Sequence, residues 1–380
     1  MRKEYLMTAG PTPIPDVIRA AEAQPIIYHR TKEHRAIFNR VSENLKLVFK
    51  TNNSVLTFAS SGTGAMEGAV ANTLSPGDKA LVIRAGKFSE RWAEICDAFG
   101  VQVVPLDIEW GDVADPSTIK AMLDEDPEIK AFFCPLCETS TGTLFPIKEY
   151  GEIIKNRPNI VFVVDAISGL GACDTQVDNW GVDVCVAGSQ KALMLPPGLA
   201  FASVSEKAWQ FIEASKLPKF YFDFKKTRKE LEKGGDTPYT PAISLIFALD
   251  ASLKLLAEEG IEGVLNRHEI LAQATRAGIQ AIGLELLSKY PANAVTAVKI
   301  PPGIDGAKVT DTLYSKYGVK VAGGQAHLKG KIFRIAHLGY MGVFDVITAI
   351  SATELTLKDL GYPVEFGKGV KAAEEILGGA

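Results

Sequence analysis

Residues 182–197 read VDVCVAGSQKALMLPP, and this stretch places a lysine directly after a buried strand. Val182, Val184 and Val186 alternate within an apolar run, which is typical of a strand in a protein core. The run breaks at a Gly-Ser pair, and Lys191 follows. Burying a lysine is costly, and desolvation favours its neutral amine, which is a nucleophile toward carbonyl carbons. Lys191 is therefore a candidate catalytic residue; a surface lysine leaving the strand end is the alternative.

A second apolar strand upstream ends on a carboxylate. Residues 159–165 read NIVFVVD, and the small-residue turn AISGLG follows. Between Asp165 and Lys191 the chain has room for a connection and one more strand, so both side chains are expected at the same edge of neighbouring strands. Such a pair suits pyridoxal phosphate, because a lysine forms a Schiff base with its aldehyde and a carboxylate keeps its pyridine nitrogen protonated.

A turn rich in glycine and hydroxyl groups follows an early predicted strand. It reads SSGTGAMEG over residues 60–68 and leads into a helix. Unpaired N–H groups at a helix N-terminus attract anions, so Ser61, Gly62 and Thr63 are predicted to hold a phosphate. A dinucleotide fingerprint fails on spacing, because Glu67 stands where its third glycine is required. A capped helix without a ligand remains the alternative.

Three more side chains are candidates for contacts with a cofactor or substrate because of their positions in the predicted elements. Phe88 lies at a predicted strand–helix junction, where an aromatic ring can stack on a cofactor, although core packing also explains it. Thr139 lies in the polar turn CETSTG, which could donate to a ring oxygen or be turn chemistry alone. Arg334 lies within the apolar strand KIFRIAHLG and needs an anion partner. That partner is either a substrate carboxylate or a buried Asp or Glu.

Composition narrows the class of protein. The chain has 380 residues, 47% hydrophobic and 23% charged, and its net charge of −4 provides no basic face for nucleic acid. The start, MRKEYLMTAGPTPIP, has no long apolar run and reaches prolines early, so we expect neither a signal peptide nor a membrane span in it. The five cysteines are odd in number and lie mostly in apolar runs, as in a cytoplasmic protein. Cys134 and Cys137 have CxxC spacing but no second pair, which favours structural thiols over a metal site.

Changes in residue composition and in the predicted pattern of helices and strands divide the chain into three predicted parts. Residues 1–20, with their prolines, form an extended N-terminal arm; residues 21–260 form a large α/β domain; and residues 261–380 form a smaller α+β domain. Within the large domain, residues 225–235 are highly charged and end in Gly-Gly, so they are expected to form a mobile loop.

Four motifs together resemble a known family. SSGTGAMEGAV, VVDAISGLG, GSQKALMLPPG and FRIAHLG occur in the order seen in class V pyridoxal-phosphate aminotransferases of the alanine–glyoxylate and serine–pyruvate (serine–glyoxylate) type. The resemblance covers nearly the whole chain. It implies the aspartate-aminotransferase-like fold (fold type I), with a mostly parallel seven-stranded sheet in the large domain. It also implies amino transfer from alanine or serine to glyoxylate or pyruvate.

The resemblance assigns roles to matching positions. Lys191 would be the Schiff-base lysine and proton carrier, and Asp165 would pair with the pyridine nitrogen. Arg334, helped by the backbone near Gly10, would bind the substrate carboxylate. The other implied contacts surround the phosphate and the ring of the cofactor: Ser61, Gly62, Thr63, Gln190, Phe88, Thr139 and Ile167. Tyr239 and Thr240 resemble residues that a neighbouring subunit lends to the phosphate, which implies a homodimer with shared active sites.

Three alternatives stay open at this stage. A related enzyme could act on an acidic amino acid such as aspartate or phosphoserine, because His29, Arg30 or Arg35 could bind a second acidic group. A lyase such as cysteine desulfurase is disfavoured, because such relatives usually have His where this chain has Gln190 and a reactive Cys on a late loop. A nucleotide-binding module without catalysis is disfavoured by the intact lysine and aspartate.

Overall fold

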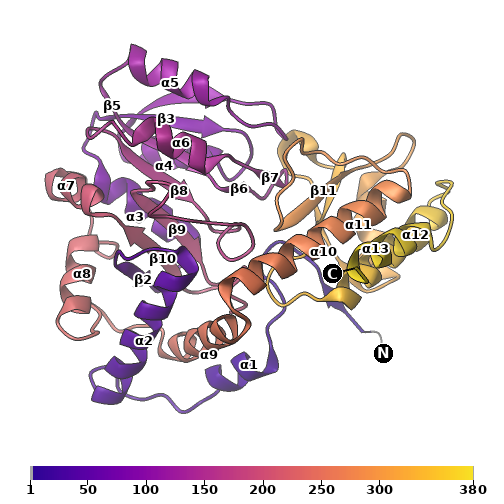
Figure 1. Ribbon diagram of the computed structural model, residues 1–380, viewed down its shortest axis with the longest axis horizontal. Coiled ribbons are helices and arrows are strands. Elements are labelled where there is room, and N and C mark those ends of the chain that lie inside the picture. Colours follow the sequence, from indigo (N-terminus) through magenta and orange to yellow (C-terminus); the bar gives the residue numbers. More distant parts are fainter. Residues whose placement is uncertain (1–2, 380) are drawn as a thin grey trace.

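A seven-stranded sheet forms the centre of the larger part of the molecule in the computed structural model, which describes residues 3–379 (Figure 1). Across the sheet the order is β2-β10-β9-β8-β5-β3-β4, and of these seven strands β10 alone runs antiparallel to its neighbours. The predicted mostly parallel sheet is confirmed. Its strands are β2 (Val55–Phe58), β3 (Lys79–Arg84), β4 (Gln102–Asp107), β5 (Ile129–Pro135), β8 (Val161–Asp165), β9 (Val184–Gly188) and β10 (Ala200–Val204).

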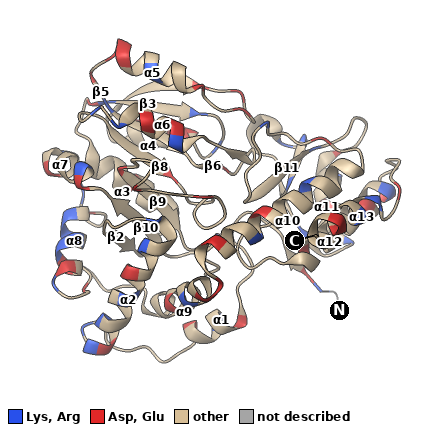
Figure 2. Cartoon of the chain, in the orientation of Figure 1, with Lys and Arg blue, Asp and Glu red and all other residues tan. Residues whose placement is uncertain are grey.

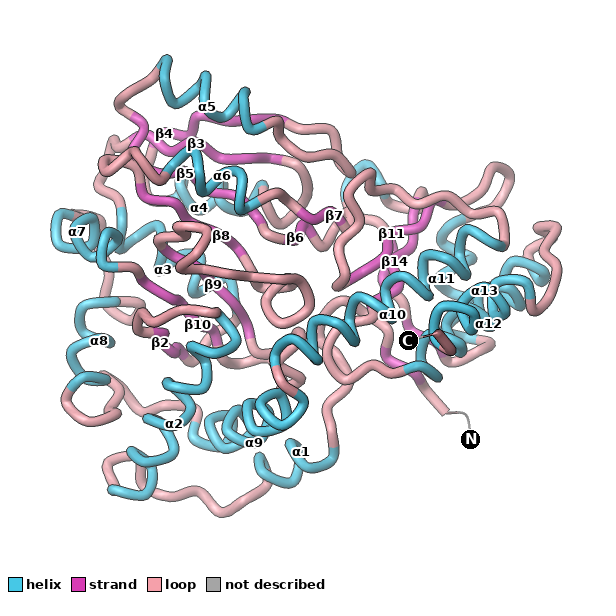
Figure 3. Tube along the Cα trace, in the orientation of Figure 1, coloured by secondary structure: helices cyan, strands magenta, loops and turns pink. Residues whose placement is uncertain are grey.

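Helices cover both faces of this sheet, because the central strands are apolar on both sides. Strands β8, β9 and β10 are buried at every position. One face packs against α3 (Gly62–Thr73), α4 (Glu90–Ala98) and α7 (Glu206–Ala214). The other packs against α1 (Asp16–Glu22), α2 (Lys32–Phe49), α5 (Pro116–Glu125), α6 (Ile147–Ile154) and α9 (Ile243–Glu259). The connection from β8 to β9, residues 166–183, crosses without a helix (Figure 3).

A smaller C-terminal domain lies beside the large sheet (Figure 1). Its own sheet has the order β11-β14-β13, and the N-terminal arm reaches it because β1 pairs with β12 in parallel. The boundary predicted at residue 260 falls at Gly260 between α9 and α10, and both predicted boundaries stay predictions. The elements are β1 (Tyr5–Leu6), α10 (Ile261–Ala281), β11 (Val295–Lys299), α11 (Gly306–Ser315), β12 (Val319–Lys320), β13 (Ala322–Gly323), β14 (Ile332–Ala336), α12 (Val343–Asp359) and α13 (Lys368–Leu377).

The mobile loop predicted at residues 225–235 is wrong, because Phe224–Glu232 forms helix α8. Asp223 caps this helix by accepting a hydrogen bond from the Lys226 backbone N–H at 3.0 Å. Phe224 is fully buried and anchors it. Charged residues of both signs occupy α8 (Figure 2). Arg228 pairs with Glu232 one turn later.

A short hairpin of β6 (Cys137–Glu138) and β7 (Thr143–Leu144) follows β5 at the carboxyl edge of the large sheet.

Within residues 3–379, none of the helices combines the length and the apolar content that crossing a bilayer requires.

The packing between β5 and β8 provides a test of the core. The rings of Phe132 and Phe162 stack with centroids 5.3 Å apart, and both side chains are fully buried. We expect Phe162→Ala to lower the free energy of unfolding by about 3–5 kcal/mol, because it removes buried area and leaves a cavity. Phe366→Ala is the control, since this ring is 58% exposed. Denaturant unfolding of both variants should show the larger loss in Phe162→Ala, and equal losses would contradict this packing.

Candidate active site

The carboxyl ends of β8 and β9 bring Asp165 and Lys191 to one cavity. Asp165 is the last residue of β8 and pairs in register with Val186 of the parallel strand β9. Lys191 follows the end of β9 by three residues. Both side chains are buried and line the same cavity. An amine and a carboxylate thus lie together at one edge of the sheet, as their positions after two neighbouring strands predict.

Most of the residues predicted to contact the cofactor line this cavity as well. Besides Asp165 and Lys191, they are Ser61, Gly62, Thr63, Phe88, Thr139, Ile167 and Gln190. They come from the N-terminus of α3, the turn before α4, the hairpin after β5 and the turns that follow β8 and β9. Segments far apart in the sequence therefore meet at one edge of the sheet.

Two residues of the cavity, Arg91 and Ser168, were missed by the sequence analysis. The Nη1 of Arg91 donates to the Thr63 hydroxyl at 3.1 Å, and its guanidinium lies 5.1 Å from the centre of the Phe88 ring. The Ser168 hydroxyl accepts a hydrogen bond from the Thr139 hydroxyl at 2.6 Å. Arg91 lies in the first turn of α4, three residues after Phe88, and this short separation was the available signal.

The amine of Lys191 is held against the N-terminal arm. Its Nζ donates to the backbone carbonyl of Ala9. Gly10 has φ of +127°, and a Cβ at this position would lie 2.5 Å from the Lys191 Nζ, so the arm can approach the lysine only with glycine here. Burial lowers the pKa of Lys191 to about 8, and the positive charges of Arg334 and Arg91 act in the same direction. A neutral, nucleophilic amine is therefore accessible near physiological pH.

The carboxyl group of Asp165 is also poised to change its charge. Burial raises its pKa to about 7, while a hydrogen bond from the Ile167 backbone N–H, at 2.8 Å, opposes the rise. A positively charged group beside this carboxyl would favour its ionised form. The site therefore suits a ligand that places a protonated nitrogen against Asp165.

The opposite end of the cavity suits an anion. Ser61 is the residue before the first turn of α3, so unpaired backbone N–H groups face this end. A Cβ on Gly62 would lie 2.5 Å from the Ile167 side chain, so no larger residue fits. The buried Gln190 Oε1 has no hydrogen-bond partner within residues 3–379. A buried acceptor without a partner indicates that a group with a hydrogen-bond donor belongs beside it.

Arg334 on β14 reaches the large sheet from the smaller domain. Its Nη1 donates to the Thr139 carbonyl at 2.9 Å, and its Nε and Nη2 donate to the Gly323 carbonyl at 3.1 and 2.8 Å. The buried ion pair considered as an alternative is not formed within residues 3–379. The guanidinium of Arg334 is thus bound to neutral carbonyl groups, so its positive charge stays available for an anion.

Tyr239 and Thr240 lie away from the Lys191 cavity of their own subunit. They line a second cavity with Phe58 and Tyr221, and they do not line the cavity of Lys191 in the described chain. The candidates for a second acidic group also have partners, since Arg30 and Arg35 pair with Asp236 at 3.0 and 2.7 Å.

Cys134 and Cys137 are buried free thiols. Burial raises the pKa of both thiols well above its ordinary value. Within residues 3–379, no three His, Cys, Asp or Glu side chains lie where they could together hold a metal ion.

Residues 5–338 match the model of a protein family described as aminotransferase class-V. The chain belongs to the class V aminotransferases. A relative named an uncharacterized aminotransferase, from Methanocaldococcus jannaschii, is 45% identical over 99% of this chain and 98% of its own. The serine–glyoxylate aminotransferase of Methylorubrum extorquens is 37% identical over 99% and 96%. The L-aspartate–glyoxylate aminotransferase of Paracoccus denitrificans is 36% identical over 96% and 94%.

A solved structure supports the same fold assignment for this class V aminotransferase. The ureidoglycine–glyoxylate aminotransferase of Bacillus subtilis superimposes with a TM-score of 0.93 at 29% identity, covering 100% of this chain and 99% of the other. The predicted PLP-dependent transferase fold, fold type I, is therefore confirmed.

The cofactor of this aminotransferase is pyridoxal 5′-phosphate, as its family implies, and the cavity fits that group. The backbone N–H groups at the start of α3 suit its phosphate. Asp165 suits its ring nitrogen, and the amine of Lys191 suits its aldehyde. The cavity thus offers residues of suitable chemistry for the phosphate and for the ring of pyridoxal phosphate.

The lowered pKa of Lys191 predicts how cofactor capture depends on pH. The neutral amine becomes more abundant as the pH rises through about 8. We expect the rate at which cofactor-free enzyme binds pyridoxal phosphate covalently to rise between about pH 7 and 9 and then level off. Stopped-flow absorbance measures this rate, and Lys191→Ala is the control without covalent capture. A rate that still rises above about pH 10, as for an ordinary lysine, would contradict this environment.

Proposed function

We propose that this aminotransferase transfers the amino group of a small amino acid, alanine or serine, to glyoxylate or pyruvate. The observation that carries the proposal is Arg334, a buried guanidinium beside the Lys191 cavity that is bound to carbonyl groups only. It can bind one carboxylate in two-pronged geometry. Of the cations considered for a second carboxylate, Arg30 and Arg35 are already paired with Asp236, and Arg91 of the cavity donates to the Thr63 hydroxyl. Relatives named for glyoxylate support the acceptor.

The side chains of the cavity account for the chemistry in this proposal. Pyridoxal phosphate, when bound, supplies an electron-withdrawing ring that stabilises negative charge at the α-carbon of an amino acid. Asp165 would keep a proton on the ring nitrogen, and Phe88 and Ile167 would hold the ring. The Nζ of Lys191 would carry a proton between the α-carbon of the substrate and the cofactor, a task for which a pKa near 8 is well matched. The burial of these groups keeps water away.

Aspartate is a second candidate amino donor, because a relative is named an L-aspartate–glyoxylate aminotransferase. Its side-chain carboxylate would need a second cation in the site. Measuring kcat/KM for alanine, serine and aspartate, each with glyoxylate, pyruvate and 2-oxoglutarate, decides between the two. Monocarboxylic pairs should be preferred, and a preference for aspartate or 2-oxoglutarate would overturn the proposal.

Replacing Arg334 tests its role in binding carboxylates. Lysine keeps the charge but cannot form two parallel hydrogen bonds with a carboxylate. We expect Arg334→Lys to raise KM for the amino donor and the oxo acid by about 10- to 100-fold, because hydrogen bonds to charged groups contribute about 1.5–3 kcal/mol. Arg84→Lys is a matched control, since Arg84 binds Asp107 through two bonds of 2.7 Å at the surface. An unchanged KM in Arg334→Lys would rule out this role.

We further propose a homodimer in which Tyr239 and Thr240 of one subunit reach the phosphate held by the other, and a cytoplasmic location. The free cysteines suit a reducing compartment. The dimer is supported by an aromatic cluster beside these residues. The ring of Tyr239 stacks on Phe220 and Tyr221 with centroids 5.7 and 5.3 Å apart. Phe220 is 72% exposed, which suits a surface that a second copy covers.

A complementation experiment tests the shared site. Lys191→Ala lacks the amine, and Thr240→Ala is expected to bind the cofactor more weakly. After unfolding and refolding together, mixed dimers would contain one site with Lys191 from one subunit and Thr240 from the other. Activity at limiting cofactor should exceed that of both variants alone, because this site is intact. Activity equal to the average of the separate variants would contradict a shared site.

A further inference from the structure

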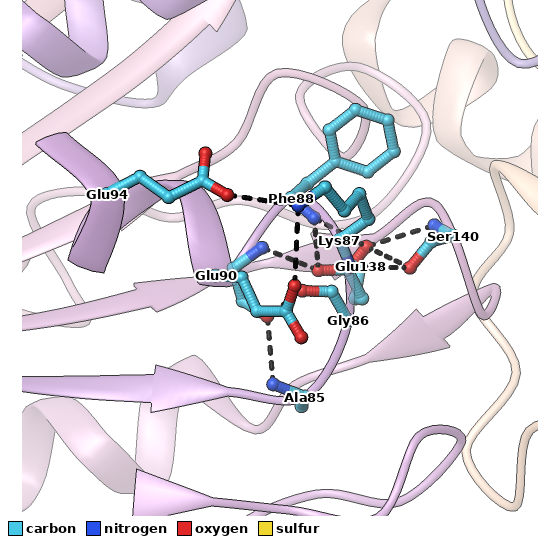
Figure 4. A network of polar contacts seen from close by, with 9 residues as sticks. Ala85, Gly86, Lys87, Phe88, Glu90, Glu94, Glu138 and Ser140 are labelled. Carbon is cyan, nitrogen blue, oxygen red and sulfur yellow. Dashed lines mark hydrogen bonds and ion pairs between the residues drawn. The ribbon is translucent and has the colours of Figure 1, made fainter. Parts of the chain in front are cut away.

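The hairpin after β5 contains a buried acid, Glu138, that none of the roles above uses. Its side chain is fully buried and lies between two loops that border the cavity (Figure 4). Its Oε2 accepts hydrogen bonds from the backbone N–H groups of Ser89 at 2.7 Å and Phe88 at 3.2 Å. Its Oε1 accepts from the backbone N–H of Ser140 at 3.0 Å and from the Ser140 hydroxyl at 2.6 Å.

The arrangement requires a carboxylate. Both oxygens receive hydrogen bonds, and all the donors are neutral N–H or O–H groups. An amide of the same shape would turn an NH₂ group toward one set of these donors and leave them unsatisfied. The loops are also pressed together here, because a Cβ on Gly86 would lie 2.4 Å from the side chain of Glu138. A loose surface contact would not show this fit.

The two loops joined by Glu138 carry groups that face the ring and the substrate. Phe88 lines the cavity on one loop, and Thr139 lines it on the other. The Thr139 carbonyl accepts from the Nη1 of Arg334 at 2.9 Å. The Lys87 backbone N–H donates to the Ser140 hydroxyl at 3.0 Å, which ties the loops a second time. One buried acid therefore supports both the ring platform and the arginine.

The charge of Glu138 acts on the same site. Burial and the nearby Glu138 both raise the pKa of Asp165. Burial lowers the pKa of Arg334, and the charge of Glu138 opposes this and favours the cationic guanidinium. The carboxylate thus helps to keep Arg334 charged for an anionic substrate.

We propose that Glu138 is a positioning residue of the active site, which locks the backbone at Phe88 and Thr139 so that ring stacking and substrate binding share one support. The proposal rests on the roles proposed above for Phe88, Thr139 and Arg334 and adds the residue that aligns them. Glu138 does not touch the reacting atoms. It acts through the geometry of its neighbours, where misplacements of about 1 Å can cost about 100-fold in rate.

Glu138→Gln tests the proposal, and Glu354→Gln is the matched control. Glu354 is also a buried acid that accepts from two backbone N–H groups, those of Gly367 at 2.8 Å and Gly369 at 2.7 Å, but it lies in the smaller domain. In cofactor-free protein, Glu138→Gln should accelerate hydrogen exchange at the amides of Phe88, Ser89 and Ser140. The control should leave these amides protected. Unchanged exchange in Glu138→Gln would overturn the proposal.

The cofactor-loaded enzyme provides a second measurement. We expect Glu138→Gln to weaken pyridoxal phosphate binding by about tenfold or more and to raise KM for the amino donor, with melting of the cofactor-free protein close to that of Glu354→Gln. Ser140→Ala, which removes one donor, should cause smaller changes in the same direction and serves if Glu138→Gln does not fold. Normal cofactor affinity and KM in both variants would overturn the proposal.

A double-mutant cycle separates this inference from the proposed function. If Glu138 acts through Phe88, the loss of cofactor affinity in the double variant Phe88→Ala/Glu138→Gln should be smaller than the product of the single losses. Losses that simply multiply would overturn the coupling. If Phe88→Ala alone binds the cofactor normally, the stacking role in the proposed function fails, whereas the exchange result for Glu138→Gln still reports on the loops.

Discussion

Burial of an amine and a carboxyl group at one edge of the large sheet is the constraint on which the rest of the site depends. Desolvation shifts both toward their neutral forms, bringing the pKa of Lys191 down to about 8 and that of Asp165 up to about 7. Without a ligand, neither group makes all of the hydrogen bonds that it can form, and this is unfavourable for a buried polar group. In the function that we propose, pyridoxal phosphate would pair with both groups.

The cavity exists because three distant parts of the chain meet at this edge. The N-terminal arm brings Ala9 and Gly10 against Lys191, and the arm itself is held by the pairing of β1 with β12. Arg334 crosses from the smaller domain to the Thr139 carbonyl on the large one. This hydrogen bond joins the two domains, so a movement of one domain relative to the other would displace Arg334, the residue that we propose binds the substrate carboxylate.

Individual misses of the sequence analysis have a common cause. Helix α8 was expected to be a loop because its residues are charged. The buried Phe224 anchors this helix and Asp223 caps it. Charge content does not reveal either contact. Arg91 and Glu138 were missed because each gains its role from neighbours in space. Arg91 lies against Phe88 and Thr63, and Glu138 binds a loop about fifty residues away in sequence.

The sequence by itself determined where the strands of the large sheet lie and which reactive side chains follow their ends. Apolar β-branched runs, followed by Gly- and Ser-rich turns, mark strand ends where reactive side chains collect, and such signals are local. Tertiary structure alone decided which carbonyl groups receive the Lys191 amine and Arg334, how Glu138 joins two loops, and that Tyr239 lies outside the cavity in its own chain. These depend on distances between segments far apart in sequence, which no local pattern specifies.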